Sequence, residues 1–305
     1  MEKNSQTTIV NKYRVPFILF GVIPPLISFF IFYVYPNFSA FFMAFTNRHG
    51  VASFENFIRF FNEFSTPTAD LRIGFKNTLL TFGILVLTYP FKVLVSYFIY
   101  KKVPFSGFYR VVFFMPTIVF SVALNIIFQH MIGPDSPIAE WVQKWMGLDY
   151  TPELLSEWRF ANKVVLLQMM WLSFAGDLIV WGGTFARIPE EVLEAGYIEG
   201  TSWWTEFTRI IVPMVWPTVS LQMVLMFCSI FSATGNVFLL TKGDYGTMTL
   251  SAWMYRFMIE NSGAKYSSNA FNYLSAVGLV FTTIAITISV FIRKLTDKVF
   301  QDVEF

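Results

Sequence analysis

Two side chains of this sequence carry charge inside long apolar runs, where charged groups are rare. Lys92 comes 15 residues after Asn77, and Asp177 comes 15 residues after Asn162. An α-helix rises about 1.5 Å per residue, so two helices that start at the same level would carry both charges to the same depth. We predict that the two side chains pair, within this chain or across to a partner. The alternative is that Lys92 extends towards the surface while Asp177 finds backbone or hydroxyl partners.

A second group of polar side chains recurs at helical spacing. Gln222, Ser229 and Asn236 are seven residues apart and would share one helix face, and Asn125 and Gln129 form a similar, smaller pair. Such a stripe could line a path for a hydroxyl-rich ligand, which needs hydrogen-bond donors and acceptors. Interhelical hydrogen bonding, which is common between membrane helices, explains the same pattern.

The residues that most often perform catalysis are scarce. The only histidines are His49 and His130, there is no H-E-x-x-H motif, and no glycine-rich phosphate loop ending in Gly-Lys-Ser/Thr is present. Cys228 is the single cysteine, which excludes an internal disulfide and a cysteine-based metal site. We therefore predict no catalytic residues, no metal site and no enzymatic activity, which disfavours an intramembrane enzyme such as a protease.

The segment 187–213 is polar and acidic although apolar runs flank it. It reads RIPEEVLEAGYIEGTSWWTEFTRIIVP. Pro189 suits the first turn of a helix, Gly200 can adopt the left-handed conformation that ends one, and Thr201 or Ser202 can cap the next. The sequence predicts two short helices joined at a glycine corner. A helix lying on anionic lipid would be basic on its polar face, so the acidic character indicates a protein partner.

These features must be positioned by apolar helices. Hydrophobic residues make up 55% of the 305 residues, charged residues only 14%, and the mean hydropathy is +0.53. Soluble domains carry about 25% charged residues, so the sequence predicts an all-α polytopic membrane protein. A net charge of +2 gives no reason to expect a nucleic-acid partner. Six segments are long enough to cross a bilayer: Phe17–Thr46, Lys76–Tyr100, Val111–Met131, Asn162–Phe185, Met214–Leu240 and Phe271–Ile292.

Lys and Arg near the span ends set the expected orientation. With the N-terminus inside, eleven lie on the cytoplasmic side and ten outside, and the inner segments are shorter and more compactly basic. We predict a cytoplasmic N-terminal tail (1–16), a six-helix transmembrane domain (17–292) and a cytoplasmic C-terminal tail (293–305). The first span is expected to be retained rather than cleaved. Segment 187–213 then faces the cytoplasm, and an amphipathic helix at 138–146 lies outside, where we expect it on the membrane surface.

The acidic segment resembles the EAA loop of permease subunits in binding-protein-dependent ABC importers. That pattern is Glu-Ala-Ala, three residues, Gly, then an aromatic residue and an Ile-x-x-Pro ending. The matching residues are Glu194, Ala195, Gly200, Phe207, Ile210 and Pro213. The chain departs from the pattern with Gly196 for the second alanine, Glu199 for aspartate and Thr201 for alanine. Glycine inside a helix costs about 1 kcal/mol relative to alanine, so we expect Gly196 to loosen this helix.

Short sequence motifs extend the same resemblance over most of the chain. They fall in the order found in carbohydrate-type permeases: YP at 35–36, AFT at 44–46, FENF at 54–57, NTL at 77–79, YRVVFFMP at 109–116 and LLTKG at 239–243. The resemblance implies a fold like that of type I ABC importer permeases. It also implies that the EAA loop is the coupling helix that seats in a cytoplasmic ATPase.

The resemblance further implies the partners and the function. We expect a second, similar but non-identical permease, two ATPase subunits and an extracellular substrate-binding protein in the bacterial plasma membrane. ATP and Mg²⁺ would bind the ATPase, and this chain would bind no cofactor. The expected cargo is a saccharide, an oligosaccharide or polysaccharide fragment, although relatives of the resembled type also carry glycerol-phosphate esters. The alternative is a stand-alone secondary carrier or channel, which would predict inverted repeats and broken helices at the midplane.

Overall fold

The computed structural model describes residues 18–232, 237–261 and 267–299, and within these the regular elements are helices. One isolated β-bridge joins Thr46 and Ala52. The all-helical fold expected from the composition is confirmed. The chain divides into two compact units, residues 1–62 with 258–280 and residues 63–257 with 281–305.

The first unit contains a long N-terminal helical run and part of the C-terminal helix. The run consists of four elements: η1 (Ile18–Val22), α2 (Ile23–Phe29), η2 (Phe30–Val34) and α3 (Tyr35–Ala44). Helix α4 (Glu55–Ser65) follows after a turn, and its last three residues belong to the second unit. The amide nitrogen of Asn56 donates to the carbonyls of Ala44 and Thr46 at 3.1 and 2.9 Å. Asn272 donates to the same Thr46 carbonyl at 3.0 Å, which ties the C-terminal helix to the end of α3.

The three π-helical stretches of the described residues share one cause. Each ends two residues before a proline: η1 before Pro24, η2 before Pro36, and η3 (Glu206–Ile211) before Pro213. Proline lacks an N–H group, and its ring clashes with the carbonyl four residues earlier. A π-helical turn moves that carbonyl to another donor, so the helix continues through the proline instead of ending. Single-turn widening of this kind replaces the sharp kinks that these prolines would suggest.

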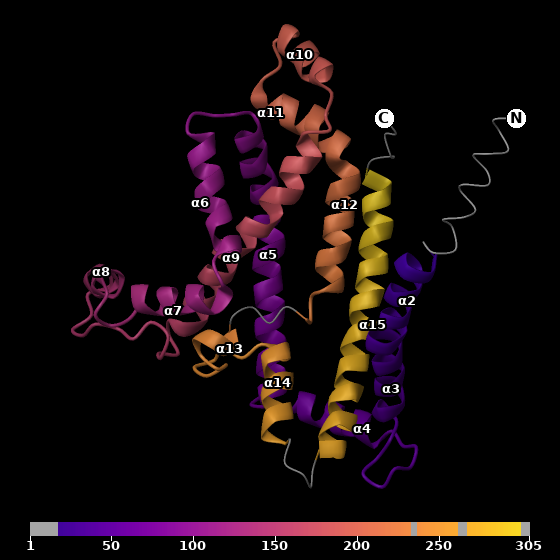
Figure 1. Ribbon diagram of the computed structural model, residues 1–305. Coiled ribbons are helices and arrows are strands. Elements are labelled where there is room, and N and C mark those ends of the chain that lie inside the picture. Colours follow the sequence, from indigo (N-terminus) through magenta and orange to yellow (C-terminus); the bar gives the residue numbers. More distant parts are fainter. Residues whose placement is uncertain (1–17, 233–236, 262–266, 300–305) are drawn as a thin grey trace, which may run out of the picture. The chain divides into compact units, whose positions relative to one another are not determined.

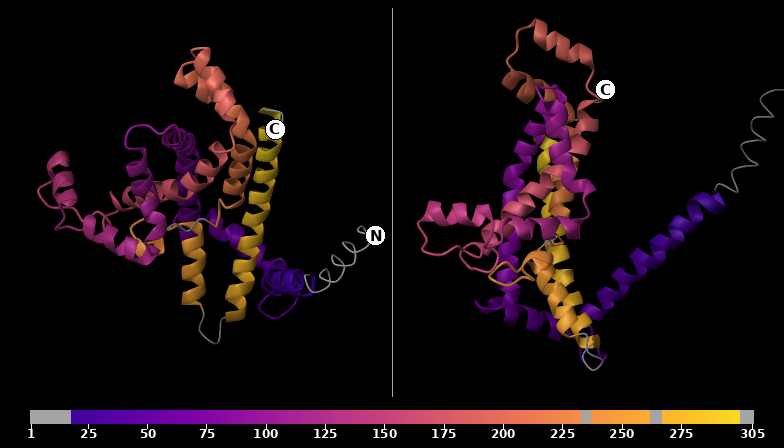
Figure 2. Two further views of the ribbon diagram at one scale, coloured as in Figure 1. Left: turned by 45° about the horizontal axis from the view of Figure 1, so that its top comes forward. Right: turned by 60° about the vertical axis from the view of Figure 1, so that its left-hand side comes forward.

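The second unit is a bundle built around α5 (Asp70–Tyr100) and α9 (Ala161–Phe185) (Figures 1 and 2). Its remaining elements are α6 (Ser106–Ile118), α7 (Ser121–Met131), α8 (Pro137–Met146), α10 (Glu190–Ile198), α11 (Trp203–Thr205), η3, α12 (Val212–Cys228) and α13 (Val237–Leu240). Helices α14 (Leu250–Glu260) and α15 (Ser267–Val299) run through both units. The expected amphipathic helix at 138–146 corresponds to α8, whose Trp141 and Trp145 rings stack 5.8 Å apart.

Five helical stretches are long and apolar enough to cross a membrane. They are Leu19–Ala44, Asp70–Tyr100, Ala161–Phe185, Trp203–Cys228 and Asn269–Val299. A sixth is present only if α6 and α7 together form one span, since they meet at an angle of 110°. The predicted third span over Val111–Met131 is therefore broken by a sharp bend between α6 and α7. Pro116 removes a backbone donor, and three β-branched residues follow it (Thr117, Ile118 and Val119), of which Val119 is extended with ψ of 134°.

The fifth span also differs from its predicted bounds of Met214–Leu240. Its helix begins at Trp203 and ends at Cys228. The Ser229 hydroxyl donates to the Met226 carbonyl at 3.0 Å, and the Ser232 hydroxyl donates to the Ser229 carbonyl at 3.1 Å. Serine side chains that bond nearby carbonyls compete with the helical ladder, which explains why the helix stops there.

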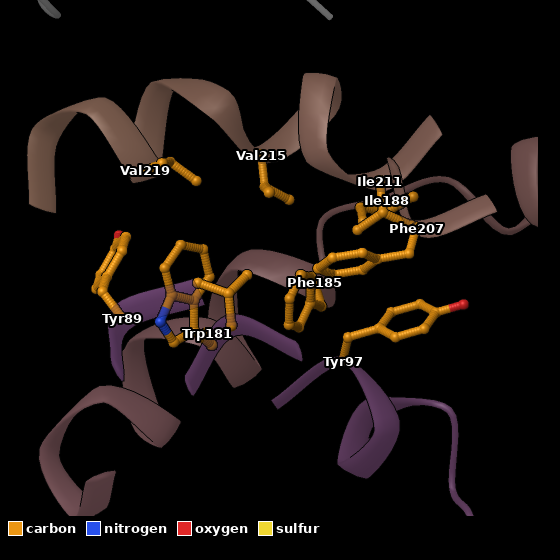
Figure 3. Close-up of a cluster of buried hydrophobic side chains, with 10 residues drawn as sticks. Tyr89, Tyr97, Trp181, Phe185, Ile188, Phe207, Ile211, Val215 and Val219 are labelled. Carbon is orange, nitrogen blue, oxygen red and sulfur yellow. The ribbon is translucent and has the colours of Figure 1, made fainter. Parts of the chain in front are cut away.

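One buried cluster joins α5, α9, η3 and α12 (Figure 3). Tyr89 and Tyr97 project from α5, Trp181 and Phe185 from α9, and Val215 and Val219 from α12. Ile188, Phe207 and Ile211 extend the cluster to the chain that enters and leaves α10. Burying a large apolar side chain contributes about 1.5–3 kcal/mol, so this cluster fixes the base of the acidic segment on the membrane helices.

Candidate functional site

The acidic segment 187–213 forms two helices meeting at a corner, which we call the coupling corner. Helix α10 ends at Ile198, and Gly200 adopts φ of +68° with its N–H donating to the Tyr197 carbonyl at 3.0 Å. Ser202 caps α11, because its hydroxyl accepts the Thr205 N–H at 3.3 Å. The glycine turn and the cap both lie where the sequence pattern places them.

Gly196 is buried at the inside of the coupling corner. A Cβ atom at this position would lie 3.2 Å from Thr201 Oγ1 and 3.3 Å from Ile210 Cδ1. The Thr201 hydroxyl donates to the Gly196 carbonyl at 2.8 Å, and the Thr201 N–H donates to the same oxygen at 3.1 Å. We expected Gly196 to loosen the helix. In the structure Thr201 closes the corner beside Gly196 with these two hydrogen bonds, and the looser helix stays a prediction.

The tip of the coupling corner presents apolar side chains to solvent. Tyr197 and Ile198 are 86% and 84% exposed, and Glu194 and Ala195 beside them are exposed too. In all three views α10 extends past the ends of α5 and α12 (Figures 1 and 2). Exposed large apolar side chains on a rigid projection are typical of a protein-binding surface.

An ion pair ties the coupling corner to α5. Lys101 Nζ lies 2.6 Å from Glu206 Oε1 and donates to Oε2 at 2.9 Å. Glu206 is buried together with Phe207 and Ile211 of η3. The sequence alone did not predict this contact. The available indication was the position of Glu206 on the same helix face as Trp203, Phe207 and Ile210.

Aromatic contacts reinforce this connection. The Phe207 and Tyr97 ring centroids are 5.1 Å apart, and those of Trp203 and Phe98 are 5.4 Å apart. Aromatic pairs at such distances add about 0.5–1.5 kcal/mol beyond their burial. Pro213 then lies in the first turn of α12. The coupling corner is thus attached to α5 and continuous with α12.

Lys92 and Asp177 are brought together, as we predicted from their equal depth. Lys92 Nζ donates to Asp177 Oδ2 at 2.9 Å, and the two side chains are 6% and 29% exposed. The pair joins α5 to α9 within the chain. Lys92 Nζ also lies 5.9 Å from the centroid of the Phe174 ring.

The polar pair of α7 bonds to neighbouring segments. Asn125 is 2% exposed and accepts a hydrogen bond from Gln168 Nε2 of α9 at 3.0 Å. Gln129 donates to the Leu239 carbonyl at 3.0 Å. Both contacts connect helices, which is the role we kept as the alternative to lining a ligand path.

The stripe predicted on the fifth span reaches only to the end of α12. Gln222 lies within α12 and Ser229 is its C-cap residue, whose N–H still donates to the Leu225 carbonyl at 3.1 Å, so the seven-residue spacing keeps these two on one helix face. Asn236 lies outside the described residues. Among the residues that the structure describes, no cluster of three His, Cys, Asp or Glu side chains could hold a metal ion.

Known proteins are similar to this chain over nearly its whole length. A multiple sugar-binding transport system permease protein of Streptococcus mutans is 24% identical over 284 residues, covering 91% of this chain and 94% of the relative. An arabinooligosaccharides transport system permease protein of Bacillus subtilis is 24% identical over 291 residues, covering 90% and 87%. No protein-family model matches the chain. The resemblance to carbohydrate-type ABC permeases inferred from the acidic segment is confirmed.

The fold also matches solved structures. Two crystal structures of a bacterial ABC transporter for the acidic polysaccharide alginate contain a chain that superposes with TM-scores of 0.77 and 0.76. The sequence identities are 20% and 19%, and the match covers 97% of this chain and 99% of the other. One of these structures holds a periplasmic protein with bound alginate pentasaccharide. The likeness shows that the chain has the fold of an ABC importer permease.

Proposed function

We propose that this chain is a transmembrane permease subunit of an ATP-driven importer that moves a saccharide across the bacterial plasma membrane by alternating access. It pairs with a second, similar permease, and two ATPase subunits bind the cytoplasmic side. An extracellular substrate-binding protein delivers an oligosaccharide or polysaccharide fragment. The relatives named as sugar permeases and the fold shared with the alginate transporter support this proposal.

The observation that carries the proposal is the coupling corner. Its tip exposes Tyr197 and Ile198, while its base is held by the Lys101–Glu206 pair and by the buried cluster. A surface that binds a partner and is rigidly joined to membrane helices suits the transmission of a motion generated elsewhere. The chain has no phosphate loop, so ATP and Mg²⁺ bind the separate ATPase.

One observation favours the second candidate, a stand-alone secondary carrier. The 110° break between α6 and α7 resembles the discontinuous helices that such carriers use near the midplane. The break does not account for an acidic corner with an exposed apolar tip, so the ATPase-coupled importer explains more of the structure.

Two matched glycine variants separate these functions. Gly200 and Gly50 both have positive φ, both donate their N–H to the carbonyl three residues earlier, and neither has a neighbour that a Cβ would touch. Proline fixes φ near −65° and removes the N–H, so each substitution disrupts one local turn. Only Gly200→Pro alters the coupling corner.

We expect the tagged wild-type chain, purified in mild detergent, to retain an ATPase and a second permease. Gly50→Pro should retain both, whereas Gly200→Pro should lose the ATPase or its transport-linked activity while remaining monodisperse. Purification of the wild type alone, stable and without ATPase activity, would favour the carrier. If both variants retain the ATPase and transport saccharide equally well, the corner does not couple ATP hydrolysis to transport.

A further inference from the structure

A second site lies at the opposite end of α5 from the coupling corner. A cavity of about 380 Å³ is lined by Asp70 in the first turn of α5, by Trp158 before α9, by the loop 243–248 and by Arg256 of α14. Its volume falls within the range of small-molecule sites, roughly 300–1,000 Å³. All of these residues belong to the second unit. Neither the coupling corner nor the Lys92–Asp177 pair contributes to it.

Trp158 gives this cavity a broad, accessible aromatic wall. Its side chain is 72% exposed, yet its six-membered ring packs against Gly246, where a Cβ would lie 2.9 Å from Cε3 and Cζ3. The loop before it is braced by Glu157, which accepts hydrogen bonds from the Tyr150 hydroxyl at 3.1 Å and from the Glu153 N–H at 2.9 Å. The hydrogen bond to Glu157 raises the pKa of the Tyr150 hydroxyl. An exposed ring supported from behind is positioned to bind a ligand rather than to fill a core.

The loop opposite Trp158 is held in one conformation. Lys242 and Tyr245 have φ of 56° and 54°, a region that residues with a side chain rarely adopt. Asn77 of α5 maintains this backbone by donating to the carbonyls of Gly246 and Met248 at 2.7 and 2.8 Å. The N–H of Leu250 donates to the Thr78 hydroxyl at 2.9 Å. Backbone strain that the surroundings enforce is concentrated at functional sites, and here it presents Tyr245 and Asp244 to the cavity.

The charges of the lining favour an uncharged ligand. Arg256 donates to Asp244 Oδ1 at 2.8 Å, so its charge is already compensated. The remaining charged side chain in the lining is Asp70, so the lining carries two carboxylates and one guanidinium. An acidic saccharide would meet net negative charge here. Carboxylates and a guanidinium can instead hydrogen-bond adjacent hydroxyl groups, while an aromatic ring covers the apolar face of a sugar.

We propose that this cavity is an entry subsite for an uncharged saccharide unit, which stacks on Trp158 and is hydrogen-bonded by Asp70, Asp244 and Arg256. The subsite rests on the proposed function, because it takes the cargo from the extracellular side before it enters the membrane path. It also narrows the cargo to a neutral oligosaccharide, in contrast to the acidic polysaccharide of the transporter with the same fold.

The test measures saccharide binding to the assembled transporter in lipid nanodiscs without its binding protein. The probes are maltotriose and raffinose as neutral trisaccharides and trigalacturonate as an acidic one, detected by saturation-transfer NMR. The variants are Trp158→Ala, Trp158→Phe and Trp145→Ala. Trp145 is the matched control, since it is 73% exposed and lies on α8 outside the cavity lining.

We expect a neutral trisaccharide to bind saturably and more tightly than trigalacturonate. Trp158→Ala should weaken its binding about 10-fold, Trp158→Phe should restore part of it, and Trp145→Ala should leave it unchanged. Absence of binding by all three probes, preferred binding of trigalacturonate, or wild-type affinity in Trp158→Ala would overturn the subsite. Loss of binding-protein docking in Trp158→Ala with unchanged saccharide affinity would assign the cavity to a protein partner and also overturn it.

ATPase co-purification and ATP-dependent uptake are measured on the same preparations. An assembled, ATP-hydrolysing transporter in which Trp158→Ala binds saccharide normally rejects the subsite but leaves the proposed function standing. A chain that recruits no ATPase rejects the proposed function itself.

Discussion

The Lys92–Asp177 pair shows how a single contact can be inferred from depth alone. Both residues were placed by counting from the polar start of their helices, and the structure joins them at 2.9 Å. Removing one partner of a buried ion pair costs about 3–5 kcal/mol, because the other charge is left uncompensated in a medium that solvates it poorly. The pair therefore fixes the register between α5 and α9.

A charge exchange tests this role. Lys92→Asp should reduce the amount of folded protein and its transport strongly, because two carboxylates then face each other between α5 and α9. Adding Asp177→Lys should restore part of both, and Asp177→Lys alone should be as harmful as Lys92→Asp. Membrane yield and uptake in the four proteins measure the effect. A double variant no better than either single one would argue against pairing as the source of the loss.

Gly196 and Thr201 form a second residue-scale unit. Alanine at 196 gains about 1 kcal/mol of helix propensity, but its Cβ would crowd the Thr201 hydroxyl at 3.2 Å. The EAA pattern has alanine at both positions. In this chain the side-chain volume missing at 196 is occupied by Thr201, so the two departures from the pattern compensate each other.

This compensation predicts that the effect of Gly196→Ala on stability changes sign with the residue at position 201. Gly196→Ala alone should lower the apparent melting temperature, whereas in the Thr201→Ala background the same substitution should raise it. Neighbouring residues of this kind have interaction energies of about 0.5–3 kcal/mol. Thermal unfolding of the four proteins in one detergent gives the interaction energy. Additive shifts would show that the hydroxyl does not limit the space at 196.

At the scale of elements, apolar patterning predicted where helices run better than where they stop. The composition, the spans and the helix–glycine–helix corner follow from patterns within a few turns of chain. The end of α12 at Cys228 and the break after Ile118 depend on serine side chains and β-branched residues that compete locally with the helix. The contact of Lys101 with Glu206 joins residues far apart in sequence, so local patterning could not predict it.

The Lys101–Glu206 pair predicts how the coupling corner acts on α5. Glu206→Gln removes the charge but keeps the shape, and the loss of stability should be modest, roughly 1 kcal/mol, because Lys101 is partly exposed. We expect the ATPase to remain bound and ATP hydrolysis to continue, with less saccharide imported per ATP hydrolysed.

Glu199→Gln is the matched control for that variant. It removes the same charge from the same corner, but Glu199 is exposed at the end of α10. Uptake and ATP hydrolysis measured together in proteoliposomes separate coupling from assembly. An unchanged ratio of uptake to hydrolysis in Glu206→Gln would show that the motion reaches the helices through α12 alone.

At the scale of the whole molecule, the proposal depends on which end of α5 faces the cytoplasm and which end faces the outside. The coupling corner and the start of α6 adjoin one end of α5, and the saccharide cavity adjoins the other. If the corner meets a cytoplasmic ATPase, the cavity must open outside. The near balance of basic residues, eleven against ten, makes the sequence a weak guide to this choice.

Cysteine labelling decides the orientation. Cys228 is the only native cysteine and would first be replaced by serine. In intact right-side-out vesicles, a membrane-impermeant maleimide should label Asp149→Cys, which lies in the exposed loop after α8. Gly107→Cys in the first turn of α6 and Glu199→Cys in the corner should react only after the membrane is permeabilised. The Gly107 position is included as a second reporter on the same side, because a bound ATPase would shield a cysteine at position 199 from the maleimide.

The opposite labelling pattern would contradict the proposed function as well as the predicted orientation. It would put the coupling corner outside, where no ATPase could bind it, and would open the cavity of Trp158 to the cytoplasm. An importer could not work with that arrangement, because its energy input and its cargo entry would be exchanged. Orientation is therefore the property on which the coupling corner and the saccharide subsite depend together.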